Sequence, residues 1–175
     1  YRDTISNQGG IIMYAIKVHN LSKTYKNGIQ ALSGLNIQVK SGEIYSLLGE
    51  NGAGKSTLIK ILTTFLKPTS GNITMLGKDI QQNSIYIRSN IACVSQQTSI
   101  DTNLSLEENM MFQAELYKIP KAEAKKRMAK LIKDFELTSY LKYPISSYSG
   151  GIKRRLDIAM NMITNPKILF LDEPT

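Results

Sequence analysis

The sequence predicts an α/β fold with a mostly parallel sheet, an antiparallel β part near the N-terminus and a helical subdomain inserted between the strand-rich ends. Three observations support this fold. Apolar and polar residues alternate over residues 35–39, as in a half-buried strand. Residues 44–48 form a short apolar run typical of a strand covered on both faces, and residues 91–94 and 168–171 are further strand candidates. The helical segments lie between those last two runs, which places an insertion at about residues 97–147.

The first part of the chain is expected to be strand-rich, and residues 1–12 are expected to be an extra segment outside the fold. Ala15, Ile16 and Val18 indicate a first strand, and a turn is expected at Ser41 and Gly42. A helix is predicted over residues 55–66, where a following proline stops it, and another strand over residues 72–76. Residues 13–175 then form one domain.

Helix signals dominate the later part of the chain. Ser105 and Glu108 have the spacing of a capping box, which predicts a helix from there to about residue 117. Further helices are predicted at about residues 121–135 and 151–163. The strand at residues 168–171 follows the last of them.

Composition places the chain among ordinary globular domains, with 42% hydrophobic and 21% charged residues among 175. The formal charge of +8 favours polyanionic neighbours without choosing among them. Much of the charge surrounds an apolar stripe at helical spacing within residues 121–135. We therefore expect a solvated face of an amphipathic helix, with a partner or lipid-headgroup surface as the alternative. Cys93 is the single cysteine, so no disulfide or multi-cysteine zinc site is expected, and we predict that it is buried.

A phosphate-binding motif follows the apolar run at residues 44–48. The motif comprises Gly49, Glu50, Asn51, Gly52, Ala53, Gly54, Lys55 and Ser56, and Thr57 continues it into the predicted helix. It fits the P-loop pattern, in which glycines let backbone N–H groups wrap a triphosphate. Lys55 is then expected to reach the outer phosphates and the Ser56 hydroxyl to bind magnesium. The fold is accordingly predicted to have a P-loop nucleotide-binding core.

Two carboxylates end the last predicted strand, where parallel sheets place their ligands. They are Asp172 and Glu173. In a P-loop protein this position is the Walker B site. Asp172 is expected to hold magnesium, directly or through water, and Glu173 to polarise the attacking water.

A third motif, Ser149-Gly150-Gly151, opens the helix predicted after residue 150. Its glycines leave space for a phosphate to approach the Ser149 hydroxyl and the N–H groups of the helix start. Taken alone, a flexible loop before a helix gives the same pattern.

The three motifs in this order resemble the ABC ATPase family, in which a P-loop, an SGG signature and a Leu-Asp-Glu-Pro-Thr segment follow one another. The resemblance covers about residues 13–175. Residues 62–64, 67–71 and 153–157 are most similar to drug-resistance exporters of the daunorubicin type.

The resemblance implies further roles. Gln96, with Gln97 as the less favoured alternative, matches a glutamine that contacts magnesium and passes the nucleotide state to a transmembrane partner. Tyr25 matches an aromatic residue that stacks on adenine. The signature of each subunit closes on the ATP of its partner, which implies a head-to-tail dimer.

The chain departs from the family pattern at two places. Ile152 stands where the family usually has a glutamine after the signature glycines. The family's switch histidine falls beyond Thr175, so the sequence is expected to be a domain truncated after Walker B, inactive by itself and prone to aggregate. His19 does not match the switch position and is expected to lie on the surface.

The resemblance implies ATP hydrolysis coupled to export, with ATP, magnesium and a transmembrane permease as partners. The protein is then expected to be cytoplasmic and peripheral on the inner face of the cell membrane. A soluble ABC ATPase acting on ribosomes or nucleic acid is the alternative, together with a nucleotide-binding fragment without turnover. The compact stretch between P-loop and signature disfavours the DNA-repair relatives, and we expect no direct binding of nucleic acid.

Overall fold

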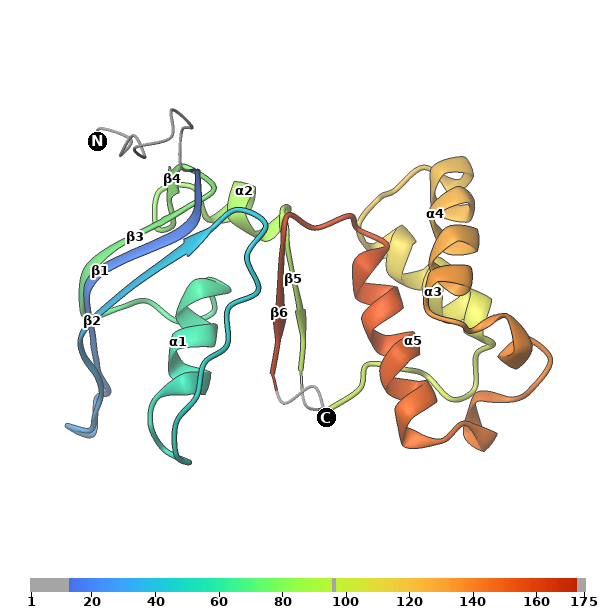
Figure 1. The fold of residues 1–175 in the computed structure, drawn as a ribbon, viewed down its shortest axis with the longest axis horizontal. Coiled ribbons are helices and arrows are strands. Elements are labelled where there is room, and N and C mark those ends of the chain that lie inside the picture. The colour runs from blue at the N-terminus through green and yellow to red at the C-terminus, as the bar shows by residue number, and fades with distance from the viewer. Residues whose placement is uncertain (1–12, 96, 173–175) are drawn as a thin grey trace. The chain divides into compact units, whose positions relative to one another are not determined.

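The computed structural model describes residues 13–95 and 97–172, which fall into two compact units, one up to Ser89 and the other from Asn90 onward. Figure 1 labels the elements of both units. Each unit has its own sheet, and the functional motifs are divided between them.

The first unit is built on a four-stranded antiparallel sheet in the order β2-β1-β3-β4. Its strands are β1 (Tyr14–Thr24), β2 (Gln30–Lys40), β3 (Ser70–Met75) and β4 (Lys78–Asp79). Val18 in the central strand lies opposite Ile37 on one side and Ile73 on the other, and all three are buried. This sheet confirms the expected antiparallel part, and His19 is exposed on β1 as predicted.

Helix α1 (Lys55–Leu62) follows the P-loop and packs against β2. Its inner face buries Leu58, Ile61 and Leu62. The helix is shorter than the predicted span of residues 55–66. Thr63 donates its hydroxyl to the carbonyl of Ile59 at 2.7 Å, and Thr64 adopts a left-handed conformation with φ of 66° that ends the helix.

The expected strand at residues 44–48 does not form. Residues 43–50 have no regular secondary structure, and the side chains of Ile44 and Leu48 are 97% and 94% exposed. An inner strand needs hydrogen-bonded neighbours on both sides. Among the described residues, the strands β1 to β4 pair with one another and β5 pairs with β6, so this apolar run has no strand beside it.

A short helix that the sequence analysis did not predict, α2 (Ser84–Arg88), closes the first unit. Ile87 is fully buried, and Arg88 donates to the hydroxyl of Thr64 at 2.9 Å. The helix therefore ties the end of the first unit to the residue that ends α1.

The second unit contains a parallel pair, β5 (Ile91–Val94) and β6 (Ile168–Leu171), in which Val94 lies opposite Leu171. The predicted burial of Cys93 is wrong. Ala92 and Val94 point to the buried face, so strand alternation turns Cys93 to the opposite face, where it is exposed. Desolvation and then the charge of Asp172 nevertheless raise the pKa of its thiol.

The helices of the second unit are α3 (Leu106–Leu116), α4 (Lys121–Asp134) and α5 (Gly150–Met162). Two 3₁₀ turns, η1 (Thr138–Tyr140) and η2 (Ile145–Ser147), connect α4 to α5. All three helices contribute to one apolar core. Helix α5 thus packs with the helices expected to form the insertion.

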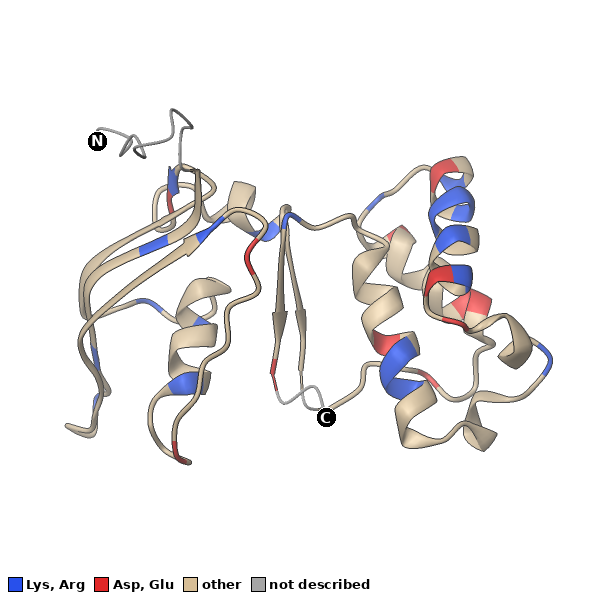
Figure 2. Cartoon of the chain, viewed as in Figure 1, with Lys and Arg blue, Asp and Glu red and all other residues tan. Residues whose placement is uncertain are grey.

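Helix α4 has the predicted amphipathic character. Met128 and Ile132 are buried, while its lysines are exposed, and Figure 2 shows the basic bands along its length. Glu123 pairs with Arg127 at 2.9 Å one turn away. Such exposed pairs stabilise a helix only slightly. The solvated face and the partner or lipid-headgroup surface both remain predictions for the basic face of this helix.

Among the residues that the structure describes, no helix has both the length and the apolar character that a membrane span requires.

The capping box at α3 is present as predicted. The Glu108 amide donates to the Ser105 hydroxyl at 3.2 Å, and the Ser105 amide donates to the Glu108 carboxylate at 2.8 Å. The bond from the backbone of Ser105, and then the bond from its side chain, lower the pKa of Glu108. Because the pKa of Glu108 is lowered, the stability that these bonds to its carboxylate contribute is present above the ordinary glutamate pKa. That contribution is lost as the pH falls through the lowered pKa.

We predict that Ser105→Ala lowers the free energy of unfolding by about 1 kcal/mol at neutral pH, because the first turn of α3 loses its acceptor. Urea unfolding monitored by circular dichroism measures the change, and the deficit should shrink in acid as Glu108 is protonated. Ser105→Asp restores an acceptor and should unfold close to wild type. An alanine variant as stable as wild type would show that the box contributes nothing.

Candidate nucleotide-binding site

The P-loop, residues 49–57, lies in the first unit and leads into α1. The Lys55 ammonium donates to the carbonyl oxygens of Gly49 at 2.6 Å and Glu50 at 2.8 Å. These two bonds hold the ammonium over its own loop. An ammonium has three N–H donors, so one donor is not used by these bonds. The positive charge is therefore concentrated at the start of α1.

Two glycines give the loop its shape. Gly52 and Gly54 both have φ of 87°, in the left-handed region that favours glycine. Gly54 also lies close to β2, because an added Cβ would be 2.5 Å from the Ala31 carbonyl oxygen and 2.8 Å from a Leu32 methyl. Position 54 must therefore be glycine for two reasons, whereas Gly52 has open space around it.

Gly54 is the N-cap of α1, and its carbonyl accepts from the Leu58 amide at 2.9 Å. No side chain caps the helix there. The first amides of a helix have no partner within the helix, and the helix dipole adds positive potential at the same end. The start of α1 therefore has the features of an anion site.

Tyr25 lies beside this helix start. Its hydroxyl is 3.0 Å from the Thr57 hydroxyl, and the Lys23 ammonium is 5.7 Å from the centre of its ring. The half-buried ring borders an open depression of about 520 Å³. The residues lining the depression are Lys23, Thr24, Tyr25, Lys26, Asn27 and Leu66.

In the second unit, β5 and β6 end at the same edge. The Asp172 amide donates to the Val94 carbonyl at 2.9 Å, so the ladder continues one residue past Leu171. Asp172 is half-buried at this edge. The other two polar residues predicted there, Gln96 and Glu173, lie outside the described residues.

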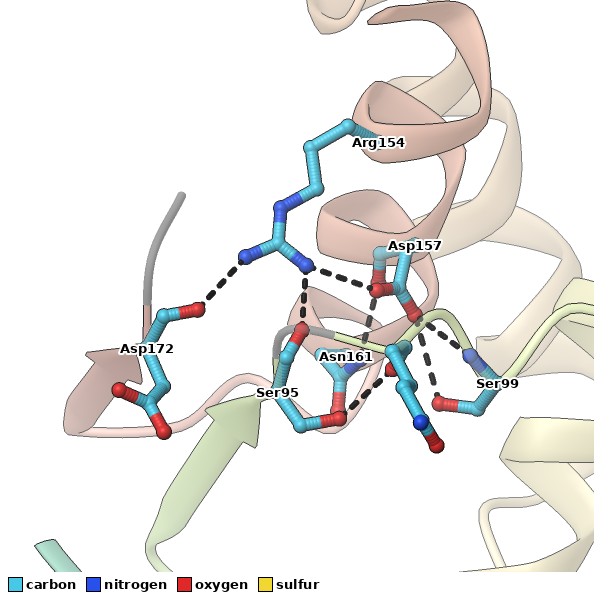
Figure 3. Close-up of polar contacts among 7 residues, drawn as sticks. Ser95, Ser99, Arg154, Asp157, Asn161 and Asp172 are labelled. Carbon is cyan, nitrogen blue, oxygen red and sulfur yellow. Dashed lines mark hydrogen bonds and ion pairs between the residues drawn. The ribbon is translucent and has the colours of Figure 1, made fainter. Parts of the chain in front are cut away.

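Arg154, on the first turns of α5, reaches this strand edge. One guanidinium nitrogen donates to the Ser95 carbonyl and lies 3.4 Å from the Asp157 carboxylate, and the other donates to the Asp172 carbonyl at 3.1 Å. Figure 3 shows the side chain extended between the two strand ends. The guanidinium thus joins α5 to the ends of both β5 and β6.

Asp157 anchors this arrangement from within the helix, where its side chain is 1% exposed. The amide and hydroxyl of Ser99 both donate to one carboxylate oxygen at 3.4 Å, and Arg154 lies at the other (Figure 3). Burial raises the pKa of Asp157, and the bond from the Ser99 amide and the charge of Arg154 partly offset it. A buried carboxylate needs such partners because its desolvation is costly.

The signature residues form the start of α5. Ser149 is the N-cap, and its hydroxyl accepts from the Ile152 amide at 3.4 Å. Gly150 and Gly151 are exposed, with nothing within 4 Å of an added Cβ. The open space that the sequence analysis expected before this helix is present.

Ile152, the departure from the family pattern, is buried in the helical core. Its apolar side chain packs where the usual glutamine would bring a polar group. The substitution therefore has a packing explanation in this chain.

The predicted residues thus form two groups. In the first unit, Tyr25 and Thr57 are in contact and Lys55 is held on the loop. The remaining polar and small P-loop side chains are exposed: Glu50, Asn51, Ala53 and Ser56. In the second unit, Asp172 is joined to the signature helix through Arg154.

Arg154 and Asp157 were not predicted from the sequence as parts of the site. The sequence contains a pattern that indicates this pair. Asp157 lies beside Leu156 and near Ala159 on the buried face of an amphipathic helix. Arg154 precedes it by three positions, at i, i+3 spacing. A buried acid requires a cation within reach. The acceptors on Ser95 and Asp172 are backbone carbonyls, which no side-chain pattern indicates.

Comparison with known proteins gives one consistent result. A family model described as "ABC transporter" matches residues 32–175. The doxorubicin resistance ATP-binding protein DrrA of Mycobacterium tuberculosis is 39% identical over 162 residues, which cover 92% of this chain and 49% of that protein. The daunorubicin/doxorubicin resistance ATP-binding protein DrrA of Streptomyces peucetius is 40% identical over 161 residues, covering 92% and 48%. The chain therefore spans about half the length of the curated relatives it matches.

Solved structures agree. CbiO1 from Clostridium perfringens, part of the ABC transporter complex cbiONQ, superposes with a TM-score of 0.83 at 34% identity, covering 93% of this chain and 66% of that one. The ADP conformation of MJ1267, an ATP-binding cassette of an ABC transporter, gives a TM-score of 0.80 at 27% identity, covering 93% and 69%. These neighbours confirm the predicted fold class.

The two P-loop glycines allow a matched prediction. Alanine at either position costs about 1–2 kcal/mol for the left-handed conformation alone. Gly54→Ala should cost more than Gly52→Ala, since only its Cβ meets the β2 backbone. Thermal unfolding of the two variants measures the difference, and equal losses would show that the contact between position 54 and β2 does not constrain the loop.

Proposed function

Because the chain belongs to the ABC transporter ATP-binding family, we propose that it binds and hydrolyses ATP as the motor of a membrane exporter. The observation that carries this proposal is the P-loop at the start of α1, where Lys55 and the first helix amides gather positive potential. The relatives are named for resistance to doxorubicin and daunorubicin, and these names support a role in export.

The first unit supplies the ATP contacts. Lys55 exchanges its bonds to the loop carbonyls for the outer phosphates, and the amides of residues 49–57 surround the phosphate chain. Tyr25 stacks on adenine, and its bond to Thr57 keeps the ring beside the helix start. The anionic phosphates then lie at the positive end of α1.

Magnesium is the metal that this chemistry implies. Ser56 offers a hydroxyl, Asp172 a carboxylate and Gln96 an amide carbonyl, and all three are the oxygen ligands that magnesium prefers. When bound, the ion neutralises the charge that develops on the phosphate oxygens. Ser56 is exposed and Asp172 is half-buried, so both oxygens are accessible to a ligand.

Hydrolysis requires a base beside the attacking water. Glu173 directly follows Asp172 and is the residue we assign to this role. It accepts the proton as the water oxygen attacks the γ-phosphorus, and the bond to the leaving ADP oxygen breaks. Lys55 holds the phosphates in line, because positioning supplies most of the rate in phosphoryl transfer.

The signature points to a dimer. Ser149, Gly150 and Gly151 at the open start of α5 contact the ATP of a second copy or a related subunit, arranged head to tail. ABC ATP-binding subunits work with transmembrane components, and we place this protein on the inner face of the cell membrane through such a permease. A ribosome-acting relative or a nucleotide-binding protein without turnover is the alternative function.

We predict that Lys55→Ala weakens ATP affinity about thirtyfold or more, equivalent to about 2 kcal/mol, because a charge-assisted bond to phosphate is lost. Titration with a fluorescent ATP analogue measures it. Lys60→Ala removes an exposed lysine from the same helix and should leave affinity unchanged. Equal affinity of Lys55→Ala and wild type, with both folded, would rule out the P-loop assignment.

We predict that Glu173→Gln in the full-length protein lowers hydrolysis at least about a hundredfold while ATP binding persists, because the amide keeps the shape but not the base. The variant should accumulate as an ATP-bound dimer. Phosphate release and light scattering measure the two effects. Undiminished turnover would show that another group activates the water, and a wild-type protein that binds ATP without turnover would favour the inactive alternative.

A further inference from the structure

Arg154 joins three segments of the second unit. Its guanidinium bonds the Ser95 carbonyl just after β5 and the Asp172 carbonyl just after β6, and it pairs with Asp157 on its own helix (Figure 3). The side chain is only 15% exposed. The contact is therefore part of the packed structure and not a surface ion pair.

The carboxylate partner fixes the direction of the arginine. Asp157 cannot turn to solvent, because it is 1% exposed and receives both donors of Ser99 from the loop after β5. Asn161 donates to the Asp157 carbonyl at 2.9 Å one turn further along α5. Arg154 and Asp157 together thus hold the loop after β5 at two residues, Ser95 and Ser99.

We propose that Arg154 is a positioning residue, which fixes Asp172 and the loop after β5 relative to the signature helix α5. This proposal rests on the proposed function, because it takes Asp172 as a residue that serves ATP. Since Ser149 caps the start of α5, a displacement of that end of the helix is transmitted by Arg154 to both strand ends. ATP hydrolysis then depends on a residue that touches neither nucleotide nor metal.

Arginine suits this role better than lysine. A planar guanidinium presents several N–H donors in fixed directions, so it bonds two carbonyls and a carboxylate at once. A lysine ammonium keeps the charge that Asp157 needs but lies on a flexible stem with a single donor atom. Arg154→Lys therefore preserves charge balance in the buried cluster while loosening the geometry.

The matched control is Arg155→Lys. Arg155 is the neighbouring residue on the same helix and is exposed. It pairs with Glu136 at a distance of 3.0 Å, and neither residue lies at the strand ends. Both variants make the same chemical change in the same helix. Any difference between them reports the position of the guanidinium.

The first measurement is steady-state ATP hydrolysis by the full-length protein. Arg154→Lys should lower kcat about tenfold or more with KM and ATP affinity within about twofold of wild type, since a small misplacement of reacting groups is costly while the P-loop is intact. Arg155→Lys should match wild type in both constants. Undiminished kcat in Arg154→Lys would overturn the positioning role.

The second measurement is amide hydrogen exchange without nucleotide. Peptides covering residues 95–100 should exchange faster in Arg154→Lys than in Arg155→Lys or wild type, because the Ser99 amide bonds Asp157. Equal exchange in all three proteins would also overturn the proposal. If the wild-type protein itself hydrolyses no ATP, the proposed function fails, and exchange still decides whether Arg154 holds this loop.

Discussion

A carboxylate buried in α5 determines the polar structure of the second unit. Asp157 lies among apolar residues, so its charge must be balanced and its oxygens must receive hydrogen bonds. Arg154 and Ser99 meet that requirement, and in doing so they draw the loop after β5 and the end of β6 onto the helix. The edge where a parallel sheet presents its ligands is therefore attached to the helix that opens with the signature.

A steric constraint has the corresponding role in the first unit. Gly54 must approach the Ala31 carbonyl more closely than any side chain allows, and this approach sets where α1 begins relative to β2. The Tyr25 hydroxyl contacts Thr57 in the first turn of this helix, and the Lys55 ammonium is held on the loop before it. The shape of the P-loop thus depends on backbone geometry, and none of the side chains of residues 49–57 is buried.

Local signals in the sequence predicted much of this architecture. The capping box at Ser105, the alternation over residues 35–39 and the helix start at Ser149 each depend on neighbours within a few residues, and each is found in the structure. The strand expected at residues 44–48 depended on partners elsewhere in the chain, which the apolar pattern cannot supply, and it does not form. The contacts of Arg154 are with backbone carbonyls brought close by tertiary packing, so no residue type marks them in advance.

Amide hydrogen exchange of the wild-type protein with and without magnesium ATP tests the central proposal, that the P-loop and Asp172 both serve ATP. We expect slower exchange on adding the nucleotide in two separate regions, the P-loop at residues 49–58 and the strand ends at residues 94–99. The exposed face of α4 should be unaffected. Unchanged exchange of the P-loop at saturating nucleotide would contradict ATP binding by the P-loop, and protection of the P-loop alone would contradict the participation of the strand ends.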